Sequence, residues 1–543
     1  MKKRNIISIG LTLVVWFIMF YFELPAINIQ NQQFWSFAVG MIVVAVVINL
    51  WPAIKYIVEN RGAYTHKELI LKFKKVIIAA AAFALIYGVG MLLSSPVLRA
   101  SDYSKLLTVE NGNFSSDVQE VDYSQIPILD RDSAAILSER KMGSMIDMVS
   151  QYEVGNNYSQ INYNGKPVRV TPLKYSSVFK WFINRSTGIP AYIKIDMATQ
   201  DTELVKLENG IKISDCEYFG RNLSRYLRFR YPSAMFEGHY FEIDDNGTPY
   251  WINPVIKKTI GLFGGVDIKG AVFVNAVTGE HQYYDVKDIP QWVDEVYSAR
   301  LLVSQYDYYG TLKNGFINSV LGQKGCLQTT EGYNYIALDD DVWVYTGITS
   351  VTGDESIVGF VLMNQRTKET KYYQLSGAKE YSAMASAEGQ VQNLRYTAAF
   401  PLLLNVEGKP TYFMALKDGS GLVKKYAMVN IEKYQIVAIG DSVAECEKNY
   451  RRLMSENGIA SEVSKEDKNS VKGIVENVFD VVIDGNSYRY IKLVGDDRLY
   501  GTMVKDKLTI LTVKETDSIE IVGYGSESGD FIEIDSFEVL KSE

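Results

Sequence analysis

Three long stretches without a charged side chain occur within the first hundred residues, and they limit what this chain can fold into more than any other feature. The stretches are Asn5–Phe22, Phe34–Trp51 and Val76–Leu98. Each has about the length of the roughly 20 apolar residues that a helix needs to cross a bilayer. We therefore predict that residues 1–99 form a three-span transmembrane anchor.

The basic residues around these stretches predict their orientation. Lys2, Lys3 and Arg4 precede the first stretch, residues 23–33 contain no Lys or Arg, and residues 55–75 contain six. Because cytoplasmic loops carry the excess of Lys and Arg, we predict a multi-pass protein of the cell membrane with a cytoplasmic N-terminus. The lipid bilayer is then a partner, and residues from about 100 onward are extracytoplasmic. A cleaved signal peptide is the alternative interpretation of the first stretch.

The rest of the chain is acidic, which argues against nucleic acid as a partner. Residues 1–75 contain nine Lys and Arg against three acids, whereas the other residues contain 47 against 61. Binding to a phosphate backbone usually needs a clustered basic surface. Hydrophobic residues make up 47% and charged residues 22%, as in a globular protein. The three cysteines are far apart in sequence and indicate no disulfide framework.

A turn followed by an aromatic residue recurs after residue 165. Its copies are Gly188-Ile-Pro190-Ala-Tyr192, Gly247-Thr-Pro249-Tyr-Trp251 and Gly408-Lys-Pro410-Thr-Tyr412. Alternating apolar and polar residues lead to the Gly of the later copies, and Pro then restarts an extended chain. This pattern predicts a β-hairpin at each copy.

A second element follows, in which an apolar strand ends in Asn, turns and returns. The Asn residues are Asn275, Asn364 and Asn430, and we interpret them as turn formers, because an Asn side chain can cap its own turn. Helix-like segments come next, at Asp288–Gln305, Ala378–Val391 and Ser442–Met454, and an earlier one lies around Tyr218–Phe229. We therefore predict an α+β fold in which residues 165–454 form about four β-β-β-β-α repeats.

The repeat resembles the PepSY-type domains of bacterial envelope proteins. The resemblance rests on a strand that runs through an Asx position into a Thr-Gly-Glu-like turn, here Val274-Asn-Ala-Val-Thr-Gly-Glu280. The whole chain is also similar to uncharacterised multi-span Gram-positive membrane proteins with such repeats. The PepSY resemblance implies binding, often modulation of envelope peptidases, and it carries over no catalytic residue.

The remaining segments complete the predicted domain organisation. Residues 100–164 form a stalk or a partial repeat, and the polar residues 455–470 form a linker. Residues 471–543 alternate short β-rich runs with turns, which predicts a small barrel-like module similar to OB or SH3-like folds.

The usual catalytic signatures are missing from the sequence. It has three histidines and no Gly-x-Ser-x-Gly, His-Glu-x-x-His, Cys-x-x-Cys or phosphate-loop motif. Paired acids could perform glycoside hydrolysis, and the same acids could hold Ca²⁺. The candidate acids are Asp244, Asp245, Asp339, Asp340 and Asp341. A third interpretation assigns these acids to turns and solvent-exposed positions, and we predict no catalytic residue, no other metal and no cofactor.

Aromatic residues of the repeats are the candidates for a ligand surface. They are Trp251, Trp292, Trp343, Tyr283, Tyr284, Tyr372 and Tyr373. Aromatic residues at a strand edge can bind peptides or sugar rings, although core packing is the alternative. We predict a non-enzymatic, membrane-anchored extracytoplasmic binding protein that modulates or scaffolds an envelope protein or peptidase. The alternative is an envelope hydrolase that uses paired acidic residues.

Overall fold

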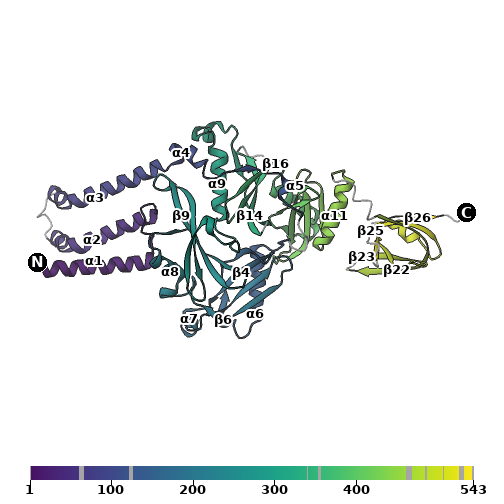
Figure 1. The fold of residues 1–543 in the computed structure, drawn as a ribbon, viewed down its shortest axis with the longest axis horizontal. Coiled ribbons are helices and arrows are strands. Elements are labelled where there is room, and N and C mark those ends of the chain that lie inside the picture. Colours follow the sequence, from purple (N-terminus) through teal and green to yellow (C-terminus); the bar gives the residue numbers. More distant parts are fainter. Residues whose placement is uncertain are drawn as a thin grey trace. The chain divides into compact units, whose positions relative to one another are not determined.

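The computed structural model describes residues 2–59, 66–120, 126–338, 340–351, 356–459, 468–483, 486–504, 507–524 and 531–540. The chain divides into two compact units, residues 1–446 and residues 447–543. In Figure 1 the first unit is coloured from purple to green, and the second ends in yellow.

The first unit begins with three helices, which are purple and blue in Figure 1. They are α1 (Lys2–Glu23), α2 (Gln32–Glu59) and α3 (His66–Leu93). The ring centroids of Trp35 in α2 and Phe83 in α3 lie 4.4 Å apart. Arg228 Nε donates a hydrogen bond to the carbonyl of Leu24 at 2.9 Å, which ties the end of α1 to the sheet-rich part of the unit.

These helices do not match the predicted membrane anchor. Among the described residues, the apolar helical stretches Ser8–Glu23 and Gln32–Ile48 are too short, and no single helix is both long and apolar enough to cross a membrane. Ile78–Leu93 and Pro96–Tyr103 reach the required length and composition only as a pair, with a bend of 46° between them. This finding overturns the three predicted spans, the multi-pass membrane location, the cytoplasmic N-terminus and the extracytoplasmic placement of later residues.

Four antiparallel sheets follow, and their strands have the same order. Sheet I contains β2 (Tyr152–Val154), β3 (Ser159–Tyr163), β4 (Lys166–Tyr175), β5 (Ile189–Asp196) and β6 (Thr202–Ile211). Sheet II contains β7 (Met235–Phe236), β8 (Tyr240–Ile243), β9 (Pro249–Ile260), β10 (Gly264–Asn275) and β11 (His281–Asp285). Sheet III contains β12 (Leu327–Thr329), β13 (Asn334–Leu338), β14 (Asp341–Ser350), β15 (Ser356–Asn364) and β16 (Thr370–Ala378). Sheet IV contains β17 (Thr397–Ala398), β18 (Leu402–Val406), β19 (Lys409–Lys417), β20 (Val423–Asn430) and β21 (Val437–Gly440).

In each of these sheets the third, fourth and fifth strands run side by side, and the first two strands both pair with the third. The predicted hairpins at 241–251 and 403–412 are the β8–β9 and β18–β19 hairpins. The hairpin predicted at 188–192 is wrong, because a helix, Val178–Asn184, precedes Gly188 and β5 begins at Ile189. Sheet I begins at Tyr152, so the segment predicted as a stalk or partial repeat supplies its first two strands. Sheet III also receives β1 (Glu110–Asn111), which pairs in parallel with β16.

The turn after the fourth strand is built in the same way in each sheet. In sheet II, Asn275 Oδ1 accepts the backbone N–H groups of Val277 and Thr278 at 3.0 and 2.9 Å. Asp196, Asn364 and Asn430 accept backbone N–H groups of their own turns in the same manner. The interpretation of the Asn residues as turn formers is confirmed by these bonds.

The fourth strand also has an irregular pairing at the same position in all four sheets, in its ladder with the fifth strand in sheets I and III and with the third strand in sheets II and IV. The residue six positions before the turn Asp or Asn is skipped in the ladder: Pro190, Lys269, Val358 and Lys424. Such irregularities increase the twist of a strand and aim its neighbours. In sheets II and III the next residue is Gly, and a Cβ at Gly359 would lie 2.5 Å from the carbonyl oxygen of Tyr373.

Further helices lie before, within and between the four sheets and after the last of them. They are α4 (Pro96–Tyr103), α5 (Phe114–Asp117), α6 (Arg131–Gly143), α7 (Val178–Asn184), α8 (Leu223–Arg230), α9 (Ala299–Leu312), α10 (Glu380–Gln390) and α11 (Val443–Glu456). The predicted helix Asp288–Gln305 begins only at Ala299, because Ser298 caps it by accepting the N–H of Leu301 at 3.2 Å. The described residues are mainly β-sheet, in five sheets counting that of the second unit, so the predicted α+β class is wrong.

Hydrophobic cores join successive sheets. One core is shared by sheets I and II, a second by sheets II and III, and a third by sheets III and IV. Sheet IV is linked to sheet I through residues 126–133, where Asp130 forms an ion pair with Lys417 and the N–H of Ile128 donates to the carbonyl of Met197 at 3.0 Å. Residues of all four sheets are therefore connected within one unit.

The second unit contains a closed five-stranded barrel where the sequence predicts a barrel-like module. Its strands are β22 (Lys468–Ile483), β23 (Asn486–Leu493), β24 (Leu499–Met503), β25 (Ser518–Tyr524) and β26 (Phe531–Leu540). Ten buried residues, among them Val475, Ile491 and Tyr500, fill its interior. Part of the predicted linker, residues 460–467, lies outside the described residues.

Candidate functional site

A polar junction is buried where sheets I, II and III meet. Arg169 of β4 is only 7% exposed, and its Nη2 donates a hydrogen bond to Oε1 of Gln160 in β3 at 3.0 Å. Its Nε has no hydrogen-bond partner among the described residues. Burial lowers the pKa of Arg169, and the nearby Tyr335, Asp130 and Glu295 act in the opposite direction. The guanidinium thus lies among acidic groups supplied by several segments.

Two carboxyl groups form the centre of this junction. Glu242 of β8 is fully buried, and its two oxygens accept the backbone N–H groups of Asp294 and Glu295, each at 3.0 Å. Asp294 is 1% exposed; its Oδ2 accepts the N–H of Asn162 at 2.7 Å, while its Oδ1 has no partner among the described residues. Burial raises the pKa of both groups, and the charge of Glu242 raises that of Asp294 further. The pair therefore holds protons more tightly than exposed acids do.

Two further acids belong to the same junction. Burial, together with the charges of Glu242 and Glu237, raises the pKa of Glu295 to about 8. Burial also raises the pKa of Glu237, whose Oε1 accepts the hydroxyl of Ser298 at 2.5 Å. We define Glu237, Glu242, Asp294 and Glu295 as the carboxyl cluster.

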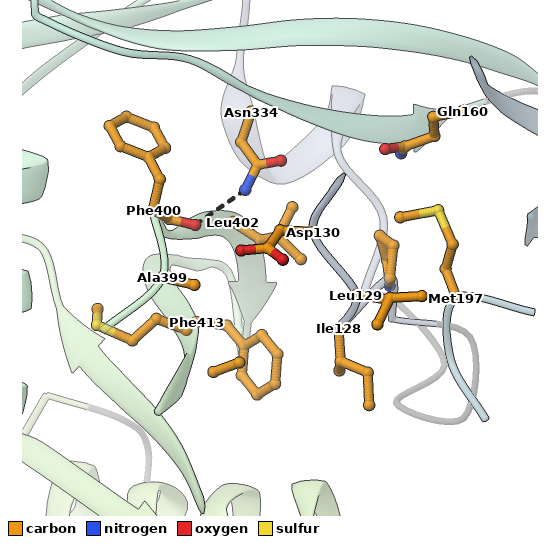
Figure 2. A pocket seen from close by; sticks show the side chains of 13 residues that line it. Ile128, Leu129, Asp130, Gln160, Met197, Asn334, Ala399, Phe400, Leu402 and Phe413 are labelled. Carbon is orange, nitrogen blue, oxygen red and sulfur yellow. Dashed lines mark hydrogen bonds between the residues drawn. The ribbon is translucent and has the colours of Figure 1, made fainter. Parts of the chain in front are cut away.

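A small cavity lies on the other side of Gln160. It measures about 30 Å³ and is bounded by residues of sheets I, III and IV together with residues 127–130. Figure 2 shows the Asp130 carboxylate and the Asn334 amide facing this space, with Phe400, Leu402, Phe413 and Met197 around it. Asn334 Nδ2 donates to the carbonyl of Phe400 at 3.0 Å, the dashed line in Figure 2. Gln160 thus connects the cavity to Arg169 and the carboxyl cluster.

The acids predicted from the sequence approach this junction but are occupied by structural contacts. Asp244 Oδ1 accepts the N–H groups of Asn246 and Thr248 in its own turn. Asp341 binds Arg366 through two hydrogen bonds of 2.6 and 2.8 Å.

One further acid of this set, Asp340, has a raised pKa. Burial and the charges of Asp341 and Asp245 raise the pKa of Asp340, and Asp340 in turn raises that of Asp294. The structure therefore brings the two acidic turns together. Asp339 lies outside the described residues.

The three tryptophans of the predicted ligand surface lie largely inside the protein. Trp251 is fully buried and Trp343 is 7% exposed, while Trp292 is half-buried against the rings of Tyr250 and Phe273. Trp251 pairs with Val274, the residue before the turn Asn, whereas Trp343 pairs with the turn residue Asn364 itself. This offset of one position places the two side chains on opposite faces of their sheets, so they are not equivalent.

The tyrosine pairs, in contrast, occupy equivalent positions. Tyr283 pairs with Val272 and Tyr372 with Val361, each partner lying three residues before the turn Asn. Both hydroxyls donate to the carbonyl of the skipped residue, Lys269 at 3.3 Å and Val358 at 2.9 Å. Tyr373 is buried, and Tyr284 packs on Phe273 with 4.6 Å between the ring centroids. Of the predicted aromatic set, Tyr283 lines a groove of about 470 Å³.

The chemistry available at the junction is limited. A general acid must lie next to the atom that it protonates, and a cavity of about 30 Å³ has room for about one water molecule. Among the described residues, no group of three or more His, Cys, Asp or Glu side chains is placed to hold a metal ion. The carboxyl cluster can accept protons and order backbone N–H groups, which stabilises the junction between sheets.

Sequence patterns did not identify Arg169, Glu242 and Asp294 as members of a site. Glu242 lies between Phe241 and Ile243, just before the turn at Asp244 and Asp245. In a strand of alternating apolar and polar residues, an acid at this position is expected to face solvent, yet Glu242 is buried. The sequence signal that could have indicated this buried acid is its place in an otherwise apolar strand. The segments that carry Arg169, Glu242 and Asp294 meet through packing between sheets, and a local sequence pattern does not predict such packing.

Comparison with known proteins gives little further information. No protein-family model and no curated protein matches the chain. A levansucrase mutant of B. megaterium is 8% identical, with 78% of this chain and 98% of that chain covered and a TM-score of 0.18. An ACO/RPE65 chimera (8% identity, 70% and 60% covered, TM-score 0.14) and the polysaccharide lyase Uly1 (8%, 78% and 92%, 0.15) are similar to the same degree. These scores are too low to carry an argument about fold or function.

Proposed function

We propose that the chain is a non-enzymatic binding protein, a modulator or scaffold that holds an extended segment of a partner protein or peptidase along the edge of a sheet. The observation that carries this proposal is the addition of the chain's own β1 to sheet III. Glu110 pairs with Lys371 and Asn111 with Tyr372, in parallel, and the N–H of Gly112 donates to the carbonyl of Tyr372 at 2.9 Å. We call residues 107–118 the strap.

Side chains of the strap hold it on this edge. Tyr373 donates its hydroxyl to Asp117 Oδ2 at 3.2 Å, and Lys371 Nζ lies 3.8 Å from the same oxygen. The ring of Phe114 packs edge-on against that of Phe360, with 5.4 Å between centroids. Main-chain pairing supplies affinity in strand addition, and alternate side chains supply specificity. The strap combines both.

The corresponding edges of sheets I, II and IV are β6, β11 and β21. Each is the last strand of its sheet, and within the described residues none has a strand paired on its outer side. The same sheet edge is therefore present four times, and among the described residues a further strand pairs with it in sheet III. The resemblance to PepSY-type domains, which implies a binding role, supports the same proposal.

The alternative of an acid-dependent hydrolase is less well supported. Asp244 and Asp341 use their oxygens in turns and an ion pair, and the cavity of about 30 Å³ is lined by Asp130 but by no member of the carboxyl cluster. Ligand sites for larger molecules usually enclose about 300–1,000 Å³.

A selection from a random peptide library tests the proposal. Displayed peptides of about ten residues are selected on the full-length protein, and the enriched peptides are synthesised with a fluorescent label. We expect saturable binding by fluorescence anisotropy with dissociation constants of about 1–100 µM, and intact peptides by mass spectrometry after prolonged incubation. Scrambled peptides of the same composition serve as controls. Failure to enrich any peptide, or cleavage of the bound peptide, would contradict the proposal.

A further inference from the structure

A basic groove lies on sheet II beside its open edge. It measures about 470 Å³, and its lining includes the cations Arg230, Lys257 and Lys269 together with the buried Val255 and Val272. None of the described residues that line it is acidic. Two acids contact residues of its lining: Asp267 forms an ion pair with Lys257, with 3.5 Å between Oδ2 and Nζ, and Asp285 accepts the hydroxyl of Tyr283. Arg230 and Lys269 give the groove its positive charge in an otherwise acidic chain.

Two of the three cations, Arg230 and Lys269, lie against aromatic rings, and Lys269 also lies at the irregular position of its strand. Arg230 lies 3.5 Å from the ring centroid of Tyr226 at the end of α8, and Lys269 lies 5.8 Å from that of Tyr283. Lys269 is the residue that the ladder of β10 skips, so its side chain is released from the regular alternation of the strand. Both cations are exposed to solvent.

The edge next to this groove matches the occupied edge of sheet III. Tyr283 and Tyr284 of β11 correspond in register to Tyr372 and Tyr373 of β16. On β16, the partner strand brings acidic residues: Glu110 pairs with Lys371, and Asp117 lies near the same lysine. On β11, every residue is exposed or half-buried, and no strand among the described residues pairs with its outer side.

We infer that the β11 edge and the adjoining basic groove bind an extended acidic peptide segment of a partner protein. The inference rests on the proposed function and specifies where the segment docks and what it carries. The peptide main chain pairs with β11 as the strap pairs with β16. Acidic side chains on one face of that strand reach Lys269 and Arg230, and this charge complementarity selects acidic over basic segments.

A synthetic peptide of about ten residues that alternates Glu and Val tests the inference, with a Lys–Val peptide as the matched control. We expect the full-length protein to bind the acidic peptide, by anisotropy, and to bind the basic peptide at least about tenfold more weakly. Lys269→Glu should weaken binding of the acidic peptide by about tenfold or more. Lys206→Glu, an exposed lysine on the open edge β6, should change it by less than about twofold. Hydrogen exchange of the complex should show protection of residues 281–285.

The outcomes separate this inference from the proposed function. Binding of the acidic peptide that Lys269→Glu leaves unchanged, or protection confined to β6 or β21, would overturn the β11 assignment while leaving peptide binding in place. Equal affinity for both peptides would overturn the acidic specificity. If library peptides bind and the acidic peptide does not, the inference fails alone. If neither binds, both proposals fail.

Discussion

Glu242 accepts the backbone N–H of Asp294 at 3.0 Å, and in this buried junction its charge also raises the pKa of the Asp294 carboxyl group. This relationship couples β8 of sheet II to residues 289–298, and it connects both to sheet I, because Asp294 accepts the N–H of Asn162 at 2.7 Å. The junction between three sheets therefore contains groups whose charge depends on pH.

The carboxyl cluster predicts that the protein loses stability as the pH rises. Each of these acids has a raised pKa in the folded state, so the folded protein binds its proton more tightly than the unfolded chain does. The resulting stabilisation is complete below the ordinary pKa of a carboxyl and is lost as the pH rises through the raised pKa. For Glu295 the window extends from 4.5 to about 8, and the slope is at most about 1.4 kcal/mol per pH unit for each proton.

Chemical denaturation across this window measures the effect. Glu295→Gln should flatten the dependence of the unfolding free energy on pH, because the amide cannot ionise. Glu208→Gln, which alters an exposed acid of β6, should leave the dependence as it is. An unchanged slope in Glu295→Gln would show that this group does not titrate in the window.

Asp341 is predicted to be a structural acid. It is 7% exposed and binds both Arg366 and the Nδ2 of Asn364, the latter at 2.8 Å. Asp341→Ala leaves a partly buried guanidinium without its carboxylate and should cost about 3 kcal/mol of stability. Asp245→Ala, at an exposed turn position, should cost less than about 0.5 kcal/mol. Thermal or urea unfolding of both variants checks the difference, and equal effects would contradict it.

The equivalence of the turns predicts that Asp can replace Asn at the turn position. Asp196 makes with its own turn the same two bonds that Asn275 makes, to N–H groups two and three residues ahead. Asn275→Asp should therefore cost less than about 0.5 kcal/mol, whereas Asn275→Ala leaves two N–H groups without an acceptor and should cost about 1–2 kcal/mol. Urea unfolding of the two variants measures the order, and a larger loss in Asn275→Asp would contradict the equivalence of the turns.

The contacts of the strap predict that residue 112 must be glycine. A Cβ at Gly112 would run into the ring of Tyr373, so Gly112→Ala should displace the strap from β16. Hydrogen exchange of residues 107–118 should become faster, with a loss of about 1–3 kcal/mol in stability. Gly143→Ala, where the added Cβ meets nothing within 4 Å, is the control and should leave the strap unchanged. Slow exchange in Gly112→Ala would show that the strap tolerates this contact.

Local patterns in the sequence predicted the parts of the fold that local contacts determine. Hairpins at 241–251 and 403–412, the Asn turns and a C-terminal barrel all depend on alternation and turn residues within about ten positions. The N-terminal stretches were read by apolar length alone, and that reading failed where the third stretch bends by 46° before Pro96. Composition alone does not report such a bend.

The candidate site could be predicted only in part. The acids at 244–245 and 340–341 do approach one another, but Glu242, Asp294 and Arg169 enter the junction through packing between sheets I, II and III. The strap pairs residues about 260 positions apart, Glu110 with Lys371, and a separation of that size leaves no signal in the intervening sequence. The equivalence of Tyr283 and Tyr372 became visible only from the strand register.

Backbone methylation of a bound peptide tests strand addition most directly. The tightest peptide from the library is synthesised with N-methyl groups on alternate residues, in both of the two possible registers, with its side chains unchanged. Because main-chain pairing supplies the affinity, one register should lose binding by at least about tenfold in calorimetric titration and the other should keep it. Equal binding of the unmodified peptide and both methylated forms would contradict the proposed addition of a partner strand to a sheet edge.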